Sequence, residues 1–132
     1  MPVTDAISDM LTRIRNAGKA KHPSVDIPGS KVCLAVADVM KKEGYIKGYK
    51  FIKDNRQGIL RIYLKYDAKE NHVIDGLKRV SKPGRRVYVR RKEIKPVLNG
   101  LGIAILSTSK GIMTDKDAIR ENLGGEWLCN IW

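Results

Sequence analysis

Hydrophobic residues recur at helical spacing in two stretches near the start of the chain, and this spacing predicts two amphipathic helices. The apolar positions of the first stretch are Ile7, Met10, Leu11, Ile14 and Ala17. Thr4 and Asp5 precede that stretch, and either side chain can cap the helix. The second helix is expected to begin after Ser30 and to end at Gly44, because glycine suits the left-handed turn that closes many helices.

The next stretch predicts strands, and in segment 59–66 the residues alternate between two faces as in a half-buried strand. Segments 45–53 and 59–66 are expected to form a hairpin across the polar turn 54–58, and segment 24–27 is expected to be extended. The polar segment 67–72 is interpreted as a linker. These elements predict an N-terminal α/β subdomain, residues 1–66, with the order α-β-α-β-β.

The second half of the chain has a different pattern, with short apolar runs separated by glycine and proline. It predicts strands at 73–81, 86–90, 103–106 and 126–132, and short helices at 93–98 and 114–122. At 82–85 a proline is followed by a glycine, which favours a type II turn. The predicted fold class is therefore α+β, with a second, β-rich subdomain at 73–132.

Charge is unevenly distributed along the chain. Of its 132 residues, 26 are Lys or Arg and 14 are Asp or Glu, which gives a formal net charge of +12. Between residues 78 and 95, Glu93 is the only acidic residue beside nine basic ones. Such a cluster attracts polyanions such as RNA, DNA or an anionic membrane surface. The alternative is a solvated face that only aids solubility. Lys82, Arg85 and Arg86 surround the predicted turn and suit contact with phosphates.

The sequence gives no sign of a metal site, a cofactor or a small-molecule substrate. Cys33 and Cys129 lie among apolar neighbours and are expected to be reduced, buried thiols. His22 and His72 are isolated in polar segments, so we expect no metal site. No apolar run approaches membrane-spanning length, and the chain is expected to be soluble and intracellular, without a membrane partner.

The most distinctive chemistry lies at the end of the strand predicted at 103–106. Three hydroxyls, an ammonium and a glycine follow it in a row: Ser107, Thr108, Ser109, Lys110 and Gly111. Short hydroxyl side chains both donate and accept, and they suit the 2′-hydroxyls and minor-groove edges of RNA. The alternative is that they terminate the strand by bonding their own backbone.

Several residues nearby bear on the same choice. Gly111, Gly124 and Gly125 would allow a ligand to approach the backbone closely. Tyr88 lies between two arginines and could stack on a base, although cross-strand packing explains it equally well.

A catalytic function receives little support from the sequence. Ser107 and Ser109 have no histidine near them in the sequence. They also lack the glycine that a nucleophile elbow requires two positions before its serine. Gly100 and Gly102 precede a strand and lack the third glycine of a dinucleotide-binding motif. We therefore predict a protein that is not an enzyme. A serine hydrolase and a DNA-binding or architectural protein remain the alternatives.

Segment 102–118, with the sequence GIAILSTSKGIMTDKDA, closely resembles the signature of the small-subunit ribosomal protein S8 family. Segments 4–17, 57–61, 77–84 and 124–126 resemble other parts of the bacterial members in the same order. The resemblance covers essentially the whole chain. It implies a structural, primary rRNA-binding protein of the cytoplasmic ribosome, which binds a helical junction in the central domain of small-subunit rRNA and helps assemble the platform.

The resemblance also implies partners and roles for individual residues. Neighbouring small-subunit proteins are expected, five and twelve among them, and some bacterial members also bind their own messenger RNA as translational repressors. Residues 107–111 would form the core RNA-binding loop, supported by Gly124, Gly125 and Glu126. A carboxylate is unexpected beside RNA, but Glu126 could accept from a base amine or a 2′-hydroxyl, or orient the serines. The first helix would contact a second RNA segment through Thr4, Asp5, Arg13, Arg15, Asn16 and Lys19.

Overall fold

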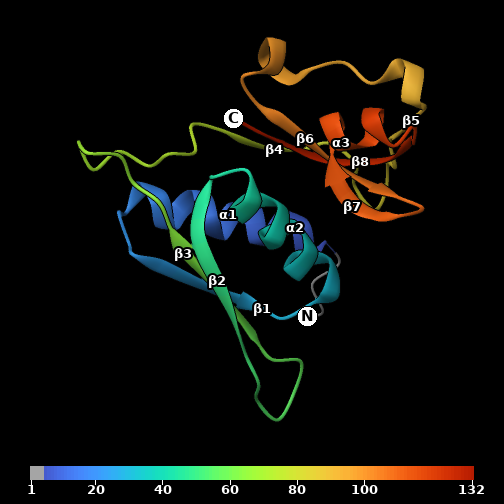
Figure 1. Cartoon of the computed structure of the whole chain (residues 1–132). Coiled ribbons are helices and arrows are strands. Elements are labelled where there is room, and N and C mark those ends of the chain that lie inside the picture. Colours follow the sequence, from blue (N-terminus) through green and yellow to red (C-terminus); the bar gives the residue numbers. More distant parts are fainter. Residues whose placement is uncertain (1–4) are drawn as a thin grey trace. The chain divides into compact units, whose positions relative to one another are not determined.

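The computed structural model describes residues 5–132, and the chain forms two compact units, Met1–Ile74 and Asp75–Trp132. Each unit has its own antiparallel sheet and its own buried core. Both contain helices and strands, so the predicted α+β class is confirmed (Figure 1).

Unit 1 has the predicted order α-β-α-β-β. Its elements are α1 (Ala6–Lys19), β1 (Ser24–Pro28), α2 (Lys31–Lys42), β2 (Ile46–Ile52) and β3 (Ile59–Leu64). Both helices begin directly after capping residues that the sequence indicated. The carboxylate of Asp5 accepts from the N–H of Ser8, and the hydroxyl of Ser30 accepts from the N–H of Cys33. The strands form a sheet in the order β1-β3-β2.

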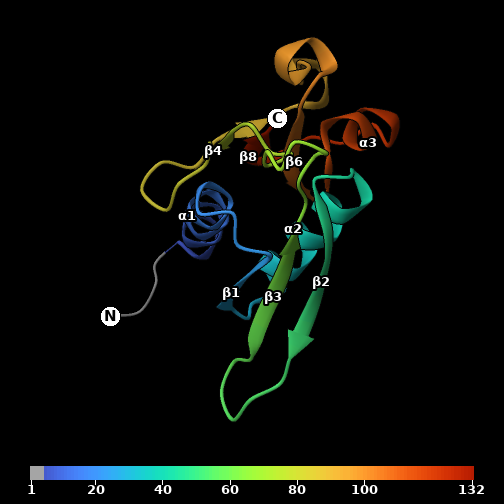
Figure 2. The same cartoon turned by 90° about the vertical axis from the view of Figure 1, so that its left-hand side faces the viewer.

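The core of unit 1 lies between this sheet and the two helices. Strand β3 alternates strictly, and Leu60, Ile62 and Leu64 are its buried positions. The helices contribute Met10, Leu11, Ile14, Val36 and Met40, all essentially inaccessible to solvent. The hairpin loop between β2 and β3 extends beyond the helices (Figure 2).

Segment 67–72 forms a hydrogen-bonded turn inside unit 1. The carboxylate of Asp67 accepts from the N–H groups of Lys69 and Asn71, and its own N–H donates to the carbonyl oxygen of Asn71. On either side of the turn, Tyr66 and His72 form an antiparallel bridge. This segment therefore has a defined, hydrogen-bonded backbone.

Unit 2 is the β-rich half. It contains β4 (Leu77–Arg79), β5 (Tyr88–Val89), η1 (Arg91–Glu93), η2 (Val97–Gly100), β6 (Ile103–Thr108), β7 (Gly111–Thr114), α3 (Asp115–Arg120) and β8 (Gly125–Ile131). The sheet has the order β4-β8-β6-β7, and β5 also pairs with β8. Its core is formed mainly by Ile103, Ile105, Leu106, Ala118, Leu128, Cys129 and Ile131.

Three predictions for unit 2 are wrong in detail. The strands predicted at 73–81 and 86–90 shrink to three and two residues, because β4 and β5 share one edge of β8: β4 pairs with its end and β5 with its beginning. The turn at 82–85 exists, but Gly84 lacks the positive φ of a type II turn. The helix predicted at 93–98 is replaced by η1 and η2, because the residue before Pro96 disfavours helical geometry.

Candidate nucleic-acid interface

The loop between β6 and β7 is a tight hairpin turn with Ser109 and Lys110 at its tip. Thr108 pairs with Gly111, whose φ of 109° would strain any residue with a side chain. The hydroxyl of Thr108 donates to the carbonyl oxygen of Gly111 at 2.7 Å and accepts from the N–H of Lys110 at 3.2 Å. This hydroxyl stabilises the turn itself, as the strand-terminating interpretation predicts for it.

The other two hydroxyls of the loop are not used in this way. Ser107 is half-buried and Ser109 is exposed, and neither side chain has a hydrogen-bond partner among residues 5–132. Lys110 lies 3.6 Å from Glu121, but both side chains are at least half exposed, so the pair contributes little. Two hydroxyls and an ammonium are therefore available to a ligand.

A row of polar and aromatic side chains runs across three strands beside this loop. Ser107 on β6 is the register partner of Glu126 on β8, and Glu126 is in turn the partner of Tyr88 on β5. Directly paired residues of antiparallel strands project from the same face of the sheet. The fold thus places three predicted site residues side by side, although they are far apart in sequence. Tyr88 as a residue is 69% exposed, which leaves its ring open to contact.

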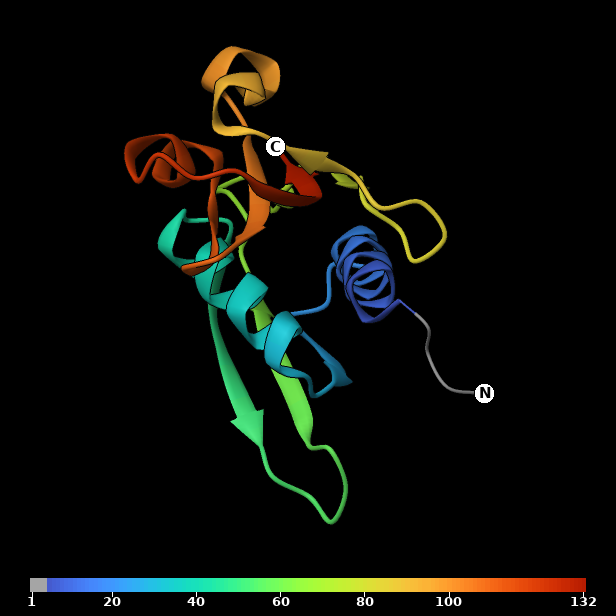
Figure 3. The same cartoon turned by 90° about the vertical axis from the view of Figure 1, so that its right-hand side faces the viewer.

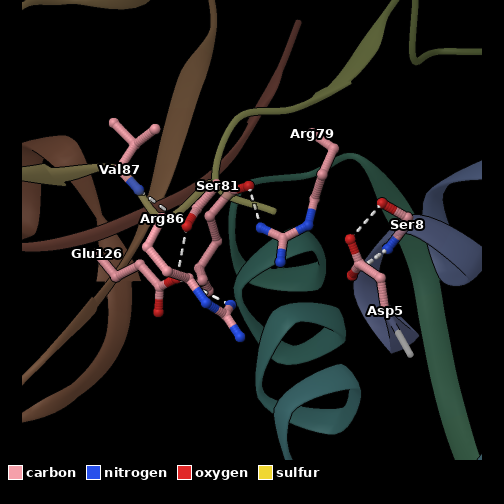
Figure 4. A network of polar contacts seen from close by, with 8 residues as sticks. Asp5, Ser8, Arg79, Ser81, Arg86, Val87 and Glu126 are labelled. Atoms are coloured by element: carbon pink, nitrogen blue, oxygen red, sulfur yellow. Dashed lines mark hydrogen bonds and ion pairs between the residues drawn. The ribbon is translucent and has the colours of Figure 1, made fainter. Parts of the chain in front are cut away.

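Glu126 is held by contacts within unit 2 (Figure 4). Its Oε2 accepts from the hydroxyl of Ser81 at 2.5 Å and lies 3.1 Å from Nη1 of Arg86. The hydroxyl of Ser81, which is fully buried, also accepts from the N–H of Val87 at 3.1 Å. The carboxylate therefore connects β8 to the chain that enters β5, and its negative charge is balanced by Arg86.

Gly124 and Gly125 permit close contacts between backbones of this unit. A Cβ at Gly125 would lie 2.2 Å from the carbonyl oxygen of Ser107, and one at Gly124 would lie 2.4 Å from that of Val89. Both distances are shorter than any real Cβ contact. These glycines are thus required for β8 to pack against its neighbours, whereas Gly111 has open space around it.

The basic turn at 82–85 leads from β4 to β5. Lys82 and Arg85 bond each other through both backbone groups, and their side chains are exposed. In the part of the chain that the structure describes, neither forms an ion pair with a carboxylate, unlike Arg86. The turn projects away from the sheet of unit 2, where Figure 3 draws it in yellow.

The predicted site residues of the first helix belong to unit 1. Asp5 has a structural role at the helix start, because its two carboxylate oxygens accept from the N–H and the hydroxyl of Ser8 (Figure 4). Arg13 pairs with Asp9 at 3.0 Å. Asn16 and Lys19 are exposed, Arg15 is half-buried, and Thr4 lies outside the described residues.

Comparison with known proteins identifies the family. A family model described as ribosomal protein S8 matches residues 5–132. The chain is 58% identical to a protein of Geotalea daltonii, 55% to one of Syntrophomonas wolfei and 55% to one of Geobacillus kaustophilus, each over the full length of both chains. All three are named small ribosomal subunit protein uS8. The chain belongs to the ribosomal protein S8 family.

Membership of the ribosomal protein S8 family confirms three of the predictions. The chain is a structural protein of the small ribosomal subunit, its place is the cytoplasmic ribosome, and it is not an enzyme. Both histidines of the chain, His22 and His72, belong to unit 1, whereas Ser107 and Ser109 belong to unit 2.

The cysteines of this S8 family member are buried in its two units. Cys33 and Cys129 are buried and not disulfide-bonded, as predicted. Burial raises the pKa of the Cys129 thiol to about 12. Among residues 5–132 no group of His, Cys, Asp and Glu side chains is arranged to hold a metal ion. In the same part of the chain, no helix has the length and apolarity to cross a membrane.

Sequence reasoning missed Ser81 as part of this site. The residue stands at the end of a predicted strand, directly before the turn at 82–85, and resembles an ordinary strand terminator. Its contact with Glu126 joins positions 45 residues apart. No pattern in the neighbouring sequence indicates that this serine is buried.

Proposed function

We propose that the chain is a primary rRNA-binding protein, which binds a helical junction in the central domain of small-subunit rRNA and helps assemble the platform. The principal contact is made by unit 2. The observation that supports this proposal is the row formed by Ser107, Glu126 and Tyr88. The row lies beside Ser109, whose hydroxyl has no hydrogen-bond partner among residues 5–132, and it belongs to the unit that contains the basic turn.

The two parts of this surface have different roles. Lys82 and Arg85 carry charge without a carboxylate partner among the described residues, so they attract phosphates whatever the sequence of the RNA. The loop and the row present short, fixed hydroxyls and an aromatic ring. Such groups read the shape of an RNA helix through 2′-hydroxyls and unpaired bases. Recognition is therefore assigned to 107–111, Glu126 and Tyr88, and attraction to the turn.

Glu126 takes part as an oriented acceptor. Its Oε2 is occupied by Ser81 and Arg86, while Oε1 has no partner in the described part of the chain. Because Arg86 compensates the charge, the carboxylate can face RNA without a net repulsive charge. Oε1 then accepts from a 2′-hydroxyl or a base amine.

The finer parts of the proposal extend beyond unit 2. Residues Arg13, Arg15, Asn16 and Lys19 on α1 would contact a second RNA segment. Small-subunit proteins five and twelve are the proposed neighbours, and repression of the chain's own messenger RNA is a further proposed role. In this proposal the chain is divided into an N-terminal α/β subdomain and a C-terminal subdomain that binds RNA.

Binding to a folded fragment of small-subunit rRNA and to duplex DNA of equal length tests the proposal. Preference for the RNA is expected, and equal affinity would contradict the proposal in favour of a DNA-binding protein.

Two substitutions test the division of roles. Ser109→Ala should weaken binding to the rRNA fragment by about 1–3 kcal/mol, the range for a lost polar contact, and leave nonspecific RNA binding unchanged. Lys82→Ala should weaken binding to every RNA by a similar factor and reduce the salt dependence of binding. The matched control is Lys50→Ala, which removes an exposed lysine on β2.

A further inference from the structure

A hollow of about 320 Å³ lies on unit 2 and contains both tryptophans of the chain, Trp127 and Trp132. Pro96 and Val97 also line it, and Asn130 contributes an amide. Its volume lies at the lower end of the range for small-ligand sites, about 300–1,000 Å³. None of these residues belongs to the surface described above.

The two indoles are fixed before any ligand arrives. Nε1 of Trp127 donates to Oδ1 of Asn130 at 2.6 Å, so its polar group is already satisfied and its ring faces remain apolar. The ring of Trp132 lies directly against Gly76, where a Cβ would be 2.1 Å from Cζ2. Rigid aromatic walls favour a flat ligand, because little side-chain freedom is lost when the ligand stacks on them.

The rim of the hollow has a clear charge preference. Lys78, the register partner of Asn130, and Lys95 both line it, and both are exposed. Across residues 5–132, neither ammonium has a carboxylate within ion-pair distance. The site therefore fits a molecule with an apolar flat face and negative charge beside it.

We propose that this hollow binds one unpaired nucleobase of a single-stranded RNA segment, stacked on the indoles, with the neighbouring phosphates at Lys78 and Lys95. Aromatic platforms flanked by cations are the general means of binding single strands, since every base has a π-face and every nucleotide a phosphate. The inference rests on the proposed function for the identity of the polymer, but it concerns a separate surface. An apolar peptide would leave both lysines without a counterion.

Intrinsic fluorescence tests the proposal directly, because no tryptophan lies elsewhere in the chain. The intact protein is titrated with a single-stranded oligonucleotide, oligoadenylate, and with inorganic polyphosphate. Saturable quenching by the oligonucleotide and none by polyphosphate is the expected result. No quenching by the oligonucleotide, or equal quenching by both, would overturn the proposal.

Substitutions separate stacking from charge. Trp127→Leu and Trp132→Leu keep an apolar wall but remove one stacking surface each, and oligonucleotide affinity should fall about fivefold or more. In Lys95→Ala the slope of log affinity against log salt should decrease by about 0.7, the value for one single-strand phosphate contact, whereas Lys50→Ala should leave it unchanged. Thermal melting confirms that each variant is folded. Unaltered affinity in both folded tryptophan variants would refute the stacking site.

The two proposals fail in different ways. Lys50→Ala, which changes an exposed residue of unit 1 outside both proposed surfaces, should leave oligonucleotide quenching intact. If the oligonucleotide quenches both indoles but the protein does not prefer folded rRNA, the proposed function is wrong and the hollow remains an RNA site. If folded rRNA is preferred but no oligonucleotide quenches, the hollow alone is wrong. Quenching by an apolar peptide in place of RNA would likewise refute it.

Discussion

Replacing Ser81 by alanine removes the hydroxyl that connects β8 to the chain entering β5. This hydroxyl donates to the carboxylate of Glu126 at 2.5 Å and accepts from the N–H of Val87 at 3.1 Å. The side chain is fully buried, so water does not readily take its place. Ser81→Ala should therefore destabilise unit 2 without removing any group that faces the proposed RNA surface.

The expected cost follows from the two hydrogen bonds. A bond to a charged group contributes about 1.5–3 kcal/mol and a neutral one about 0.5–1.5 kcal/mol. Glu126 keeps Arg86 and a side chain that is 19% exposed, so part of the charged contribution is replaced after the substitution. We expect the free energy of unfolding to fall by about 2–3 kcal/mol.

Urea denaturation of the full chain measures this loss, and Ser109→Ala is the matched control. Ser109 is exposed and its hydroxyl has no partner in the described part of the chain, so its replacement should change stability by less than about 0.5 kcal/mol. Glu126→Gln tests the charge. In that background Ser81→Ala should cost about 1 kcal/mol less, because the hydrogen bond has lost its ionic partner.

Two results would refute this reasoning. If Ser81→Ala and Ser109→Ala were equally harmless, the buried hydroxyl would not be a stabilising contact. If Ser81→Ala cost the same with and without the Glu126 charge, the charge would contribute nothing to this hydrogen bond.

Three further predictions concern other parts of the chain. Gly125→Ala would place a Cβ 2.2 Å from a backbone oxygen of β6 and should lower the melting temperature sharply, whereas Gly84→Ala, with nothing within 4 Å, should be tolerated. The Arg61 guanidinium holds the pKa of Asp26 below its usual range. This exposed pair therefore stabilises the fold above the unfolded pKa of about 4, and the effect is lost as the pH falls through the folded pKa. Asp26→Asn should reduce the acid dependence of the free energy of unfolding by less than about 1 kcal/mol, measured by denaturation at a series of pH values. Burial raises the pKa of Cys129 to about 12, and its thiol should react with a thiol reagent at pH 8 only after denaturation.

Local sequence was sufficient for the elements whose ends are set by neighbouring residues. Asp5 and Ser30 cap the two helices of unit 1, as their positions before apolar repeats predict. The β2–β3 hairpin follows from the polar turn between two strand-like segments and from the alternation of the second one. In each case the deciding interaction spans only a few residues, so the pattern and the structure agree.

Local sequence was insufficient where two segments compete for one partner. The apolar character of 73–81 and 86–90 predicts long strands, but β8 has a single free edge for both, and each pairs with only part of it. Strand length there is a property of β8 and of the turn between β4 and β5. No pattern within either segment contains that information.

The sequence by itself determined the composition of the surface: the basic cluster, the hydroxyl loop and the motifs of the ribosomal protein S8 family. Tertiary structure alone decided which of those groups are available. It assigned the Thr108 hydroxyl to the turn and left that of Ser109 open, placed Ser107 beside Glu126, and brought Trp127 and Trp132 to one hollow. The physical reason is that a hydroxyl or carboxylate functions through its partners, and partners on different strands are set by the register of the sheet.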